Sequence, residues 1–345
     1  MKALVIYPPH DLRLEEVETQ PLGAAQLRVR IRAGGICGSD LHYYQHGGFG
    51  TVRVREPMVL GHEVSGVVAE VGGEAAGFAP GDRVAVSPSR PCGACRYCRA
   101  GLPNHCLNMR FYGSAAPTPH VGGAFRQEIV VEAWQAHKVS DAVSDGEAAM
   151  SEPLSVALHA VGRAGQLLGK RVLVTGCGPI GALICIAARR AGALDVVVTD
   201  IADEALAGAH RVGVDRTINT AKDPGALAAY GEGKGSFDVM FEASGSEKAL
   251  KSAIDVVRPR GVIVQVGNSG AEMTLPVNLI TAKEIDLRGS YRFHEEFAQA
   301  VDYLNRGLID VRPLITASFP FAEFKAAFAL AGDRSRAMKV QLTFS

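Results

Sequence analysis

A glycine-rich turn constrains the fold of this 345-residue chain more than any other feature. The turn reads Gly176-Cys177-Gly178-Pro179-Ile180-Gly181. It follows the apolar run 171–175, which is typical of a buried strand, and it opens the apolar segment 180–191, which predicts a helix. In a GxGxxG turn the glycines permit a tight bend, a close approach of the backbone to a bound group, and close packing of helix on strand. The helix N-terminus is then expected to bind a pyrophosphate through its free N–H groups.

Asp200 follows the next predicted strand, 196–199. A carboxylate at this point can bond both hydroxyls of a ribose, and it repels a 2′-phosphate. No arginine follows within the next several residues to bind such a phosphate. The turn and Asp200 together indicate a dinucleotide site that favours NAD over NADP. A simple capping role for Asp200 is the alternative interpretation.

Strands and helices alternate through the middle of the chain. Further strands are predicted at 237–241, 262–266 and 285–288, and further helices at 203–209 and 247–257. Near-continuous apolar strands that alternate with helices predict a parallel sheet with helices on both faces. The sequence therefore predicts an α/β, doubly wound part.

The first 150 residues have a different pattern, in which short strand-like runs predominate. Segment 27–32 reads LRVRIR, which predicts a strand with Leu27, Val29 and Ile31 toward a core and Arg28, Arg30 and Arg32 toward water. Similar short runs lie at 64–71, 83–86 and 125–131, separated by glycine and proline. This pattern predicts a small β-barrel-like domain. Short helices are predicted after Ser144 and at 153–163, and the chain ends with predicted helices at 295–305 and 321–331 and a strand at 339–344.

Composition narrows the class of protein. Lys plus Arg and Asp plus Glu both number 36, so the formal net charge is zero, whereas a nucleic-acid binder usually shows a basic excess. No apolar run approaches the roughly 20 residues that span a bilayer. We therefore expect a cytoplasmic protein with no nucleic-acid or membrane partner, whose seven cysteines are thiols or metal ligands.

Four of the cysteines form a tight cluster in the sequence. Cys92, Cys95, Cys98 and Cys106 are spaced C-x2-C-x2-C-x7-C. Four thiolates this close can surround one tetrahedral ion, and a closed sulfur site of this kind suits a structural zinc. An iron–sulfur cluster is the main rival. A nucleic-acid-binding zinc knuckle is disfavoured because the nearby arginines are few.

A second set of candidate metal ligands is dispersed along the chain. Cys37, His62 and Glu152 supply the sulfur, nitrogen and oxygen ligands that a catalytic zinc uses while one coordination position stays open. Taken singly, the same residues also suit a core thiol, a loop histidine and a helix cap. Their spacing alone therefore leaves both interpretations open.

A resemblance favours the catalytic interpretation. The matching segments are 34–45, 57–64, 91–98, 109–114, 152–160, 178–181, 287–293 and 331–342. Through them the sequence resembles the zinc-containing medium-chain dehydrogenases over essentially its full length. Within that family it resembles the polyol branch, which is sorbitol dehydrogenase-like, and segments 109–114 and 287–293 resemble the members that act on L-idonate. The resemblance also disfavours the iron–sulfur alternative.

The resemblance implies an architecture and a set of roles. It implies a GroES-like catalytic domain from residues 1–151 and 291–345, split by a Rossmann domain at 152–290. It implies two zinc ions per subunit, NAD(H) as cofactor and a homo-oligomer, dimer or tetramer. Beyond Cys37, His62 and the four-cysteine cluster it implies these residues: Glu63 or Glu152 as a further zinc ligand, Asp40 as the carboxylate that fixes the histidine, Ser39 and His42 as a proton relay, and Lys339 near the pyrophosphate. Where Glu63 is the ligand, the resemblance gives Glu152 a catalytic role, in which it holds the zinc-bound water. One departure is Gly38, where alcohol dehydrogenases often carry arginine.

The implied reaction is oxidation of a secondary alcohol on a sugar acid, L-idonate to 5-keto-D-gluconate. Zinc lowers the pKa of the hydroxyl, Ser39 and His42 carry the proton away, and hydride passes to the nicotinamide. The candidates for the substrate pocket are Arg110, Arg292 and His120 at the carboxylate and Tyr43 and Phe111 along the carbon chain. One alternative is a neutral-polyol dehydrogenase for a sorbitol- or xylitol-type substrate. A different class is a non-catalytic protein that binds zinc and nucleotide.

Overall fold

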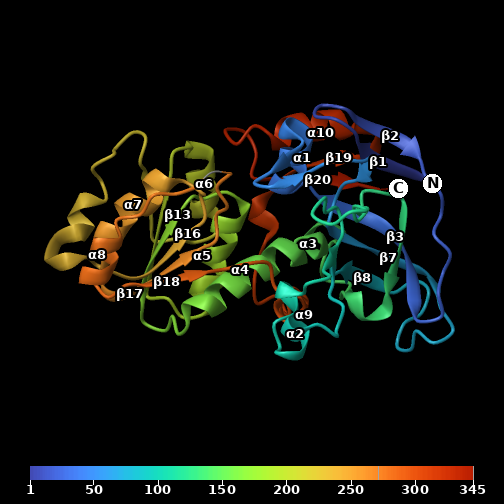
Figure 1. Ribbon diagram of the computed structural model, residues 1–345, viewed down its shortest axis with the longest axis horizontal. Helices are drawn as coiled ribbons and strands as arrows, with labels where there is room; N and C mark the ends of the chain where they lie inside the picture. Colours follow the sequence, from blue (N-terminus) through green and yellow to red (C-terminus); the bar gives the residue numbers. More distant parts are fainter. Residues whose placement is uncertain (271, 345) are drawn as a thin grey trace.

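The computed structural model describes residues 1–270 and 272–344. It shows an elongated molecule in which a parallel sheet with its helices lies at one end and a β-rich part at the other (Figure 1). The chain starts in the β-rich part, crosses to the parallel sheet in its middle third and returns at its end. Helix α4 (Ser151–Ala164) and helix α9 (Glu296–Asn305) contact each other between the two parts.

The parallel sheet has six strands in the order β15-β14-β13-β16-β17-β18, and every pairing in it is parallel. The strands are β13 (Arg171–Thr175), β14 (Asp195–Asp200), β15 (Arg216–Asn219), β16 (Phe237–Glu242), β17 (Val257–Gln265) and β18 (Asp286–Gly289). Numbered within the sheet, this order is 3-2-1-4-5-6, that of the doubly wound dinucleotide-binding fold. The direction of winding reverses between β13 and β16, and ligands of such folds bind beyond the carboxyl ends of the strands there. The predicted fold class is confirmed.

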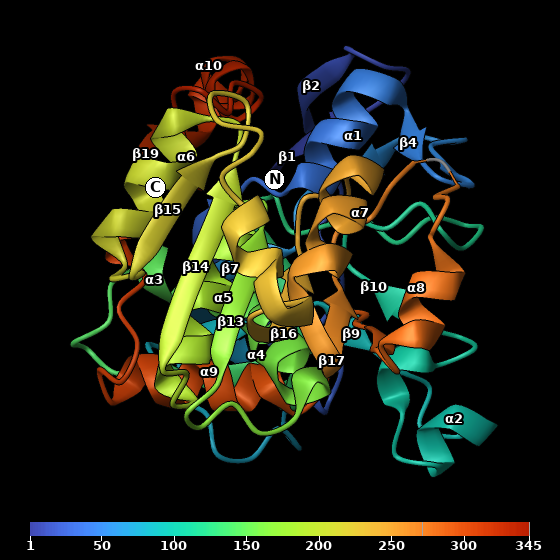
Figure 2. The same ribbon diagram turned by 90° about the vertical axis from the view of Figure 1, so that its left-hand side faces the viewer.

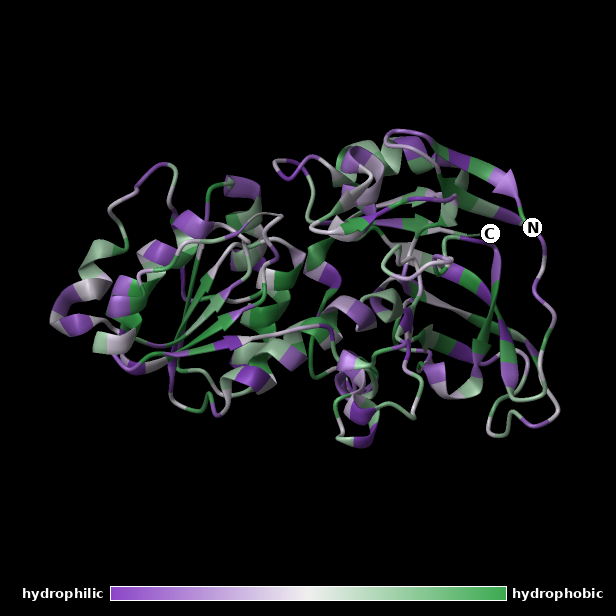
Figure 3. Cartoon of the chain, in the orientation of Figure 1, coloured by the Kyte–Doolittle hydropathy of each residue, from purple (hydrophilic) through white to green (hydrophobic). Residues whose placement is uncertain are grey.

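Apolar residues on alternate sides of the strands explain why helices cover both faces. Val172 and Val174 of β13 join the buried cluster of α4 and α5 (Pro179–Arg190), whereas Leu173 joins the cluster of α7 (Glu247–Val256). Figure 2 shows α5 and α7 on the two sides of the sheet, and Figure 3 shows the hydrophobic colour of its strands. The remaining helices here are α6 (Asp203–Arg211), α8 (Val277–Ala282) and the 3-10 segment η3 (Ala228–Lys234).

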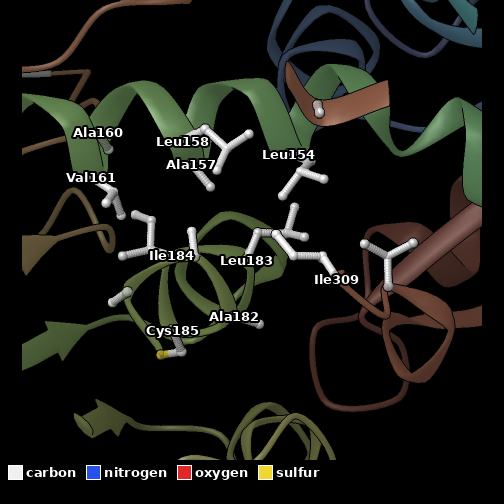
Figure 4. Packing of buried hydrophobic residues seen from close by; sticks show 14 of the residues in the cluster. Leu154, Ala157, Leu158, Ala160, Val161, Ala182, Leu183, Ile184, Cys185 and Ile309 are labelled. Carbon is white, nitrogen blue, oxygen red and sulfur yellow. The ribbon is translucent and has the colours of Figure 1, made fainter. Parts of the chain in front are cut away.

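Helix α4 packs on α5 through small and branched apolar side chains. Leu154, Ala157 and Val161 of α4 face Leu183 and Ile184 of α5 (Figure 4). All five are buried. Burying a leucine or isoleucine side chain contributes on the order of 2 kcal/mol. This contact fixes α4, which carries Glu152, against the helix that follows the glycine-rich turn.

The β-rich part is built on a seven-stranded mixed sheet. Its strands are β3 (Gln26–Gly35), β7 (Glu63–Val71), β8 (Arg83–Val86), β11 (Glu128–Glu132), β12 (Ala136–Lys138), β19 (Ile315–Pro320) and β20 (Lys339–Thr343). Strand β3 pairs antiparallel with β7, β11 and β20. The β3–β20 pairing brings the end of the chain beside its N-terminal third. As a result, Lys339 lies near residues that precede it by some 300 positions.

Smaller elements complete this part. They are β1 (Lys2–Ile6), β2 (Leu12–Glu16), β4 (Gly48–Phe49), β5 (Val52–Arg53), β6 (Met58–Val59), β9 (Ser89–Arg90), β10 (Arg110–Phe111), α1 (Gly38–His46), α2 (Arg96–Arg99), α3 (Asp145–Ala149), α10 (Phe324–Ala331), η1 (Pro103–His105), η2 (Ala133–Gln135), η4 (Arg312–Leu314) and η5 (Phe321–Glu323). Helix α3 begins at the predicted cap, since the Ser144 side chain accepts from the Glu147 N–H. Helix α1 was not predicted, although it carries four candidate site residues, Ser39, Asp40, His42 and Tyr43.

Two expectations from the sequence need correction. Arg28 was expected to face water, but it is buried and its guanidinium pairs with Glu70 at 3.1 Å and donates to the Gln20 carbonyl. A paired and hydrogen-bonded arginine can be buried beside its alkyl stem, which the alternating pattern does not reveal. The strand predicted at 125–131 is observed at Glu128–Glu132, because residues 124 and 125 form hydrogen bonds to the 60–61 loop instead.

An ion pair joins α4 to α9. His159 Nδ1 lies 2.9 Å from Glu296 Oε1, and Glu296 Oε2 accepts from the His294 N–H at 2.8 Å. Although burial alone would raise the pKa of Glu296, the hydrogen bonds from His159 and from the backbone lower it to about 2. Because this pKa lies below that of an unfolded glutamate, the carboxylate stabilises the fold above about pH 4.5 and loses that contribution as the pH falls toward 2.

Replacing Glu296 with glutamine is expected to lower the free energy of unfolding by roughly 2–3 kcal/mol near neutral pH. The loss should shrink as the pH falls from about 4.5 toward 2, because the glutamate of the unfolded wild type is protonated first and the folded carboxylate only near pH 2. Urea unfolding at several pH values measures both effects. The exposed neighbour Glu295, replaced with glutamine, is the matched control. A pH-independent loss, or an equal loss in E295Q, would contradict the assignment.

Candidate active site

Asp40 holds two loops together at the start of α1. Its Oδ2 accepts from the Cys37 N–H at 3.0 Å, and its Oδ1 accepts from the Gly61 N–H at 3.1 Å. The carboxylate is fully buried, and burial raises its pKa. Two charge-assisted bonds to backbone N–H groups fix the loops that carry Cys37 and His62. Asp40 Oδ1 lies 3.9 Å from His62 Nδ1, so Asp40 adjoins the histidine without forming a hydrogen bond to it.

Cys37, His62 and Glu63 converge from α1 and from the start of β7. One potential ligand atom from each lies within 4.8 Å of the others. His62 and Glu63 are buried, and within the described residues the buried His62 Nδ1 has no hydrogen-bond partner. Desolvation, followed by the nearby Glu63 carboxylate, raises the pKa of Cys37 to about 12. A thiolate at this position therefore needs an added cation, and a thiolate, an imidazole and a carboxylate suit zinc. The donor set fits the ion.

Glu152 lies beside this cluster at the start of α4. It is buried, and burial raises its pKa to about 8, with His62 opposing the rise and Glu63 and Cys37 adding to it. These interactions place Glu152 close to all three residues, although it lies outside the group within 4.8 Å. Of the two glutamates, the structure thus brings Glu63 nearer to Cys37 and His62.

Lys339 pairs with Glu63 rather than facing an open surface. Its Nζ donates to Glu63 Oε2 at 2.7 Å, to Glu63 Oε1 at 2.8 Å and to the Ile36 carbonyl at 3.2 Å. Although burial alone would lower the pKa of Lys339, the Glu63 carboxylate raises it. An ammonium group has three donors, and all three are used here. A contact to a pyrophosphate requires Lys339 to give up one of these bonds, so its cofactor role stays a prediction.

The four-cysteine cluster also comes together, in the lobe of residues 92–106. The four sulfur atoms of Cys92, Cys95, Cys98 and Cys106 lie within 4.8 Å of one another. Backbone N–H groups of Cys92 and Asn108 point at Cys106 Sγ at 3.2 and 3.3 Å. Backbone hydrogen bonds, first from Cys98, lower the pKa of Cys95 to about 6. N–H donors that favour thiolates, around a compact set of four sulfurs, fit a closed zinc site.

The glycine-rich turn has the geometry that a dinucleotide site requires. Gly176 has φ +84°, and a Cβ there would lie 2.7 Å from the Ser244 backbone. A Cβ on Gly181 would lie 1.9 Å from the Gly176 carbonyl oxygen. Gly178 is the N-cap of α5 and supplies no side-chain cap, with Pro179 and Ile180 in the first helical turn. The first N–H groups of the helix are therefore open to an anion.

Asp200, at the end of β14, contacts the same turn. Its Oδ2 accepts from the Cys177 N–H at 2.6 Å, and its Oδ1 accepts from the N–H groups of Ile201 and Ala202 at 2.7 and 2.9 Å. Carboxylate oxygens have further lone pairs, so these bonds leave room for ribose hydroxyls. The capping role and the predicted ribose role are thus compatible.

Replacing Asp200 with serine is expected to lower kcat/KM with NAD by about tenfold or more and to raise the NADP/NAD preference, because the carboxylate that bonds the ribose and repels a 2′-phosphate is removed. Steady-state kinetics with the two dinucleotides measures both changes. The control is Asp203→Ser, which removes an exposed carboxylate paired with Lys222. An unchanged preference in D200S would contradict the ribose role.

Arg292 lies beside the metal-ligand cluster. Its guanidinium carbon lies 4.4 Å from the ring centroid of Phe111, and that ring lies 5.6 Å from the His62 ring. Among residues 1–270 and 272–344, no carboxylate forms an ion pair with Arg292 or Arg110. Arg110 neighbours Phe111 on the short strand β10, and adjacent strand residues face opposite sides. Arg292 and His62 therefore both contact the Phe111 ring, whereas Arg110 points to the other side of β10.

The other predicted pocket residues have local partners. Tyr43 is buried in the core, and its OH accepts from the Ala115 N–H at 3.1 Å. His120 Nε2 accepts from the Arg55 N–H and its Nδ1 lies 2.8 Å from the Pro117 carbonyl, so neither ring nitrogen is available to a substrate in this conformation.

The two residues of the predicted proton relay lie on α1, close to Cys37. Ser39 is half-buried two residues from Cys37, whereas His42 is exposed one turn further along the helix. Desolvation, and then the nearby His46, lower the pKa of His42. Within the described part of the chain, no hydrogen bond joins Ser39 to His42. A proton relay through both requires a bridging group, such as the cofactor ribose of the prediction.

Glu242 is a site residue that the sequence analysis missed. It is fully buried at the end of β16, directly beside Thr175 of β13, the strand that leads into the glycine-rich turn. Its oxygens accept from the N–H groups of Ser244 and Gly245 at 2.8 and 3.0 Å and from Gln265 Nε2 at 2.7 Å. This network shapes the loop against which Gly176 packs. An acidic residue that ends an apolar strand, as Asp200 does, was the available signal.

Known proteins provide the comparison that assigns the family. The Alcohol dehydrogenase GroES-like domain matches residues 23–141, and the Zinc-binding dehydrogenase family matches residues 179–306. L-idonate 5-dehydrogenase (NAD(P)(+)) of Escherichia coli K12 is 43% identical over 316 residues, 92% of this chain and 91% of the relative. This chain belongs to the zinc-binding dehydrogenases. The predicted α/β fold, the GroES-like part and the dehydrogenase class are thereby confirmed.

Two further similarities define where in the family the chain lies. The crystal structure of L-idonate 5-dehydrogenase from E. coli K-12 superposes with a TM-score of 0.95 at 41% identity, covering 99% of this chain and 98% of that one. Sorbitol dehydrogenase of Bos taurus is 37% identical over 94% of this chain and 91% of its own length. Both predicted branches are therefore represented among the relatives. Within residues 1–270 and 272–344, no helix is both long and apolar enough to span a bilayer.

Proposed function

We propose that this zinc-binding dehydrogenase oxidises C5 of L-idonate to give 5-keto-D-gluconate, with NAD as hydride acceptor. The observation that carries the proposal is Arg292, whose guanidinium has no acidic partner in the described chain and lies on Phe111 beside His62. A planar guanidinium binds a carboxylate through two parallel hydrogen bonds. The 43% identity with the E. coli enzyme supports the same substrate.

The proposed mechanism starts from the metal ligands. Cys37 and His62 would hold zinc together with Glu63 or Glu152, and the ion would supply Lewis-acid chemistry that makes the substrate hydroxyl easier to deprotonate. Ser39, half-buried two residues from Cys37, accepts the hydroxyl proton, and exposed His42 releases it to solvent after transfer through a group that bridges the two. The glycine-rich turn and Asp200 would hold NAD, which would supply the hydride acceptor. Arg292 fixes the far carboxylate and thereby selects the carbon that reacts.

The identity of the product tests this proposal. Purified, zinc-loaded protein is incubated with L-idonate and NAD, and the product is identified by carbon-13 NMR while NADH absorbance is followed. The expected product is 5-keto-D-gluconate in a one-to-one ratio with NADH. Oxidation at another carbon, or no NADH from L-idonate, would overturn the proposal. NADH from sorbitol alone would move the assignment to the neutral-polyol alternative, which the bovine relative favours.

Replacing Arg292 with methionine is expected to raise KM for L-idonate by about tenfold to a hundredfold, because a charge-assisted bidentate contact contributes roughly 1.5–3 kcal/mol. The kcat/KM for sorbitol should change little, since sorbitol has no carboxylate. Arg110→Met is the matched control, and its smaller effect is expected from its place on the other side of β10. An unchanged KM for L-idonate in R292M would remove Arg292 from the carboxylate site.

Three features remain proposals of the same kind. We place the GroES-like domain at residues 1–151 and 291–345 and the Rossmann domain at 152–290, which agrees with the separate sheets. The two ligand clusters support two zinc ions per subunit. By resemblance to the polyol branch, the protein is expected to act in the cytoplasm as a homo-oligomer, dimer or tetramer.

A further inference from the structure

The four-cysteine lobe contacts the segment that carries Arg292. Asn104, buried between Cys98 and Cys106, donates from Nδ2 to the Tyr291 carbonyl at 3.0 Å across 187 residues of sequence. The His105 ring stacks on the Tyr291 ring with centroids 5.8 Å apart and planes 26° apart. The Tyr291 side chain is otherwise half-exposed. The lobe therefore supplies both a polar and an aromatic contact to a residue in the chain segment between β18 and α9.

Arg292 itself has a backbone conformation that needs such support. Its φ is +56°, in the left-handed region that non-glycine residues seldom adopt. A residue held there costs of order 1–3 kcal/mol, and it persists only where neighbouring contacts determine it. On one side Tyr291 is tied to the lobe, and on the other Phe293 is buried against Phe297, with ring centroids 5.8 Å apart. These two anchors fix the backbone of Arg292 from both sides.

The direction of the Arg292 side chain follows from this backbone. The guanidinium carbon lies 4.4 Å from the Phe111 centroid and 5.1 Å from the Tyr291 centroid. Phe111 in turn packs against His62 of the metal-ligand cluster. A continuous set of contacts thus runs from Asn104 and His105, through Tyr291 and Arg292, to the ring that adjoins His62.

We infer that the four-cysteine lobe sets substrate specificity: Asn104 and His105 are positioning residues that hold Arg292 over Phe111, where it binds the carboxylate of a sugar acid. The inference rests on the proposed function for the identity of the ligand. In this inference the four-cysteine lobe does more than hold residues 92–106 together around a metal. A positioning role also gives a reason for the contacts of Asn104 and His105 with Tyr291, the residue before Arg292.

The test replaces the amide of Asn104 with a carboxylate of nearly the same shape. In Asn104→Asp, an acceptor faces the Tyr291 carbonyl oxygen and the hydrogen bond is lost. KM for L-idonate is expected to rise by about tenfold, the effect of losing roughly 1.4 kcal/mol of a charge-assisted contact, with kcat/KM for sorbitol within about twofold of wild type. Leu107→Ala, an exposed apolar side chain of the same lobe region, is the matched control. Zinc content is measured in every variant.

A double-mutant cycle separates positioning from general damage. If Asn104 acts through Arg292, N104D should have no further effect on KM for L-idonate in the R292M background. Equal losses with L-idonate and sorbitol, or additive effects of N104D and R292M, would overturn the inference.

A spectroscopic readout makes the test independent of the substrate. The Arg292 Nε–H signal, assigned by its disappearance in R292M, is expected to carry an upfield ring-current shift from Phe111 in wild type and in L107A. In N104D the signal should move toward the position of a solvent-exposed arginine, and an unchanged signal would overturn the inference. If wild type shows no preference for L-idonate, the proposed function fails, but the movement of this signal still decides whether Asn104 positions Arg292.

Discussion

Replacing Cys37 with alanine is expected to lower kcat/KM by about a thousandfold or more, because the loss of a catalytic metal removes several kcal/mol of transition-state stabilisation. Cys37, His62 and Glu63 are the residues whose ligand atoms converge within 4.8 Å, and two ligands hold an ion far less well than three. The variant should therefore also lose one bound zinc per subunit. Steady-state kinetics and elemental analysis of the dialysed protein measure the two effects together.

The control for this prediction is a buried cysteine that lies away from the ligand clusters. Cys185 lies in α5 within the core and outside both ligand clusters. Cys185→Ala should keep full zinc content and near-normal kcat, losing only some stability through a small cavity. A C37A protein that retained its zinc and its activity would show that this cluster is not the catalytic metal site.

Replacing Cys98 with serine is expected to unfold the four-cysteine lobe locally while the rest of the molecule stays folded. Three of its four cysteines are partly or fully exposed, and only Cys106 is buried, so the lobe has little apolar core of its own. Metal-binding energy is then folding energy for this segment. Hydrogen-exchange protection across residues 92–106 should fall by about a thousandfold or more, and one zinc per subunit should be lost.

The same C98S variant tests whether the four-cysteine lobe affects substrate binding. Loss of the lobe releases the Asn104 contact to Tyr291, so KM for L-idonate should rise more than kcat falls. Arg99→Ala, an exposed neighbour, controls for surface changes in the same turn. Intact exchange protection in C98S, with zinc content unchanged, would contradict a closed metal site at these four sulfurs.

Local patterns explain what the sequence could predict. The unit of β13, glycine-rich turn and α5 was predicted within one residue, because Gly176 and Gly181 are needed where a Cβ would collide with backbone and because the centre of the strand, Val172–Val174, is apolar. The spacing of the four cysteines likewise predicted that their sulfur atoms come together. Both signals lie within about 20 residues of sequence, where pattern and geometry are directly related.

Contacts between distant segments could not be predicted in the same way. The Lys339–Glu63 pair spans 276 residues and depends on the β3–β20 pairing, so no local pattern could indicate that this lysine pairs with a glutamate. The hydrogen bond from Asn104 to Tyr291 likewise joins residues that are far apart in the sequence, so it could not be predicted from a local pattern. Helix α1 was missed because it has little apolar periodicity and only Asp40 and Tyr43 of its residues are buried. It begins where Asp40 bonds the Cys37 N–H, a tertiary arrangement that also needs Gly61.

The central claim is that a zinc-binding dehydrogenase uses a guanidinium at the end of its pocket to select a sugar acid over a neutral polyol. The most direct measurement is the ratio of kcat/KM for L-idonate to kcat/KM for sorbitol, determined with NAD and fully zinc-loaded protein. The account predicts a ratio of about a hundred or more, because a charge-assisted, bidentate contact is made only by the acid. A ratio near one, or a preference for sorbitol, would contradict it.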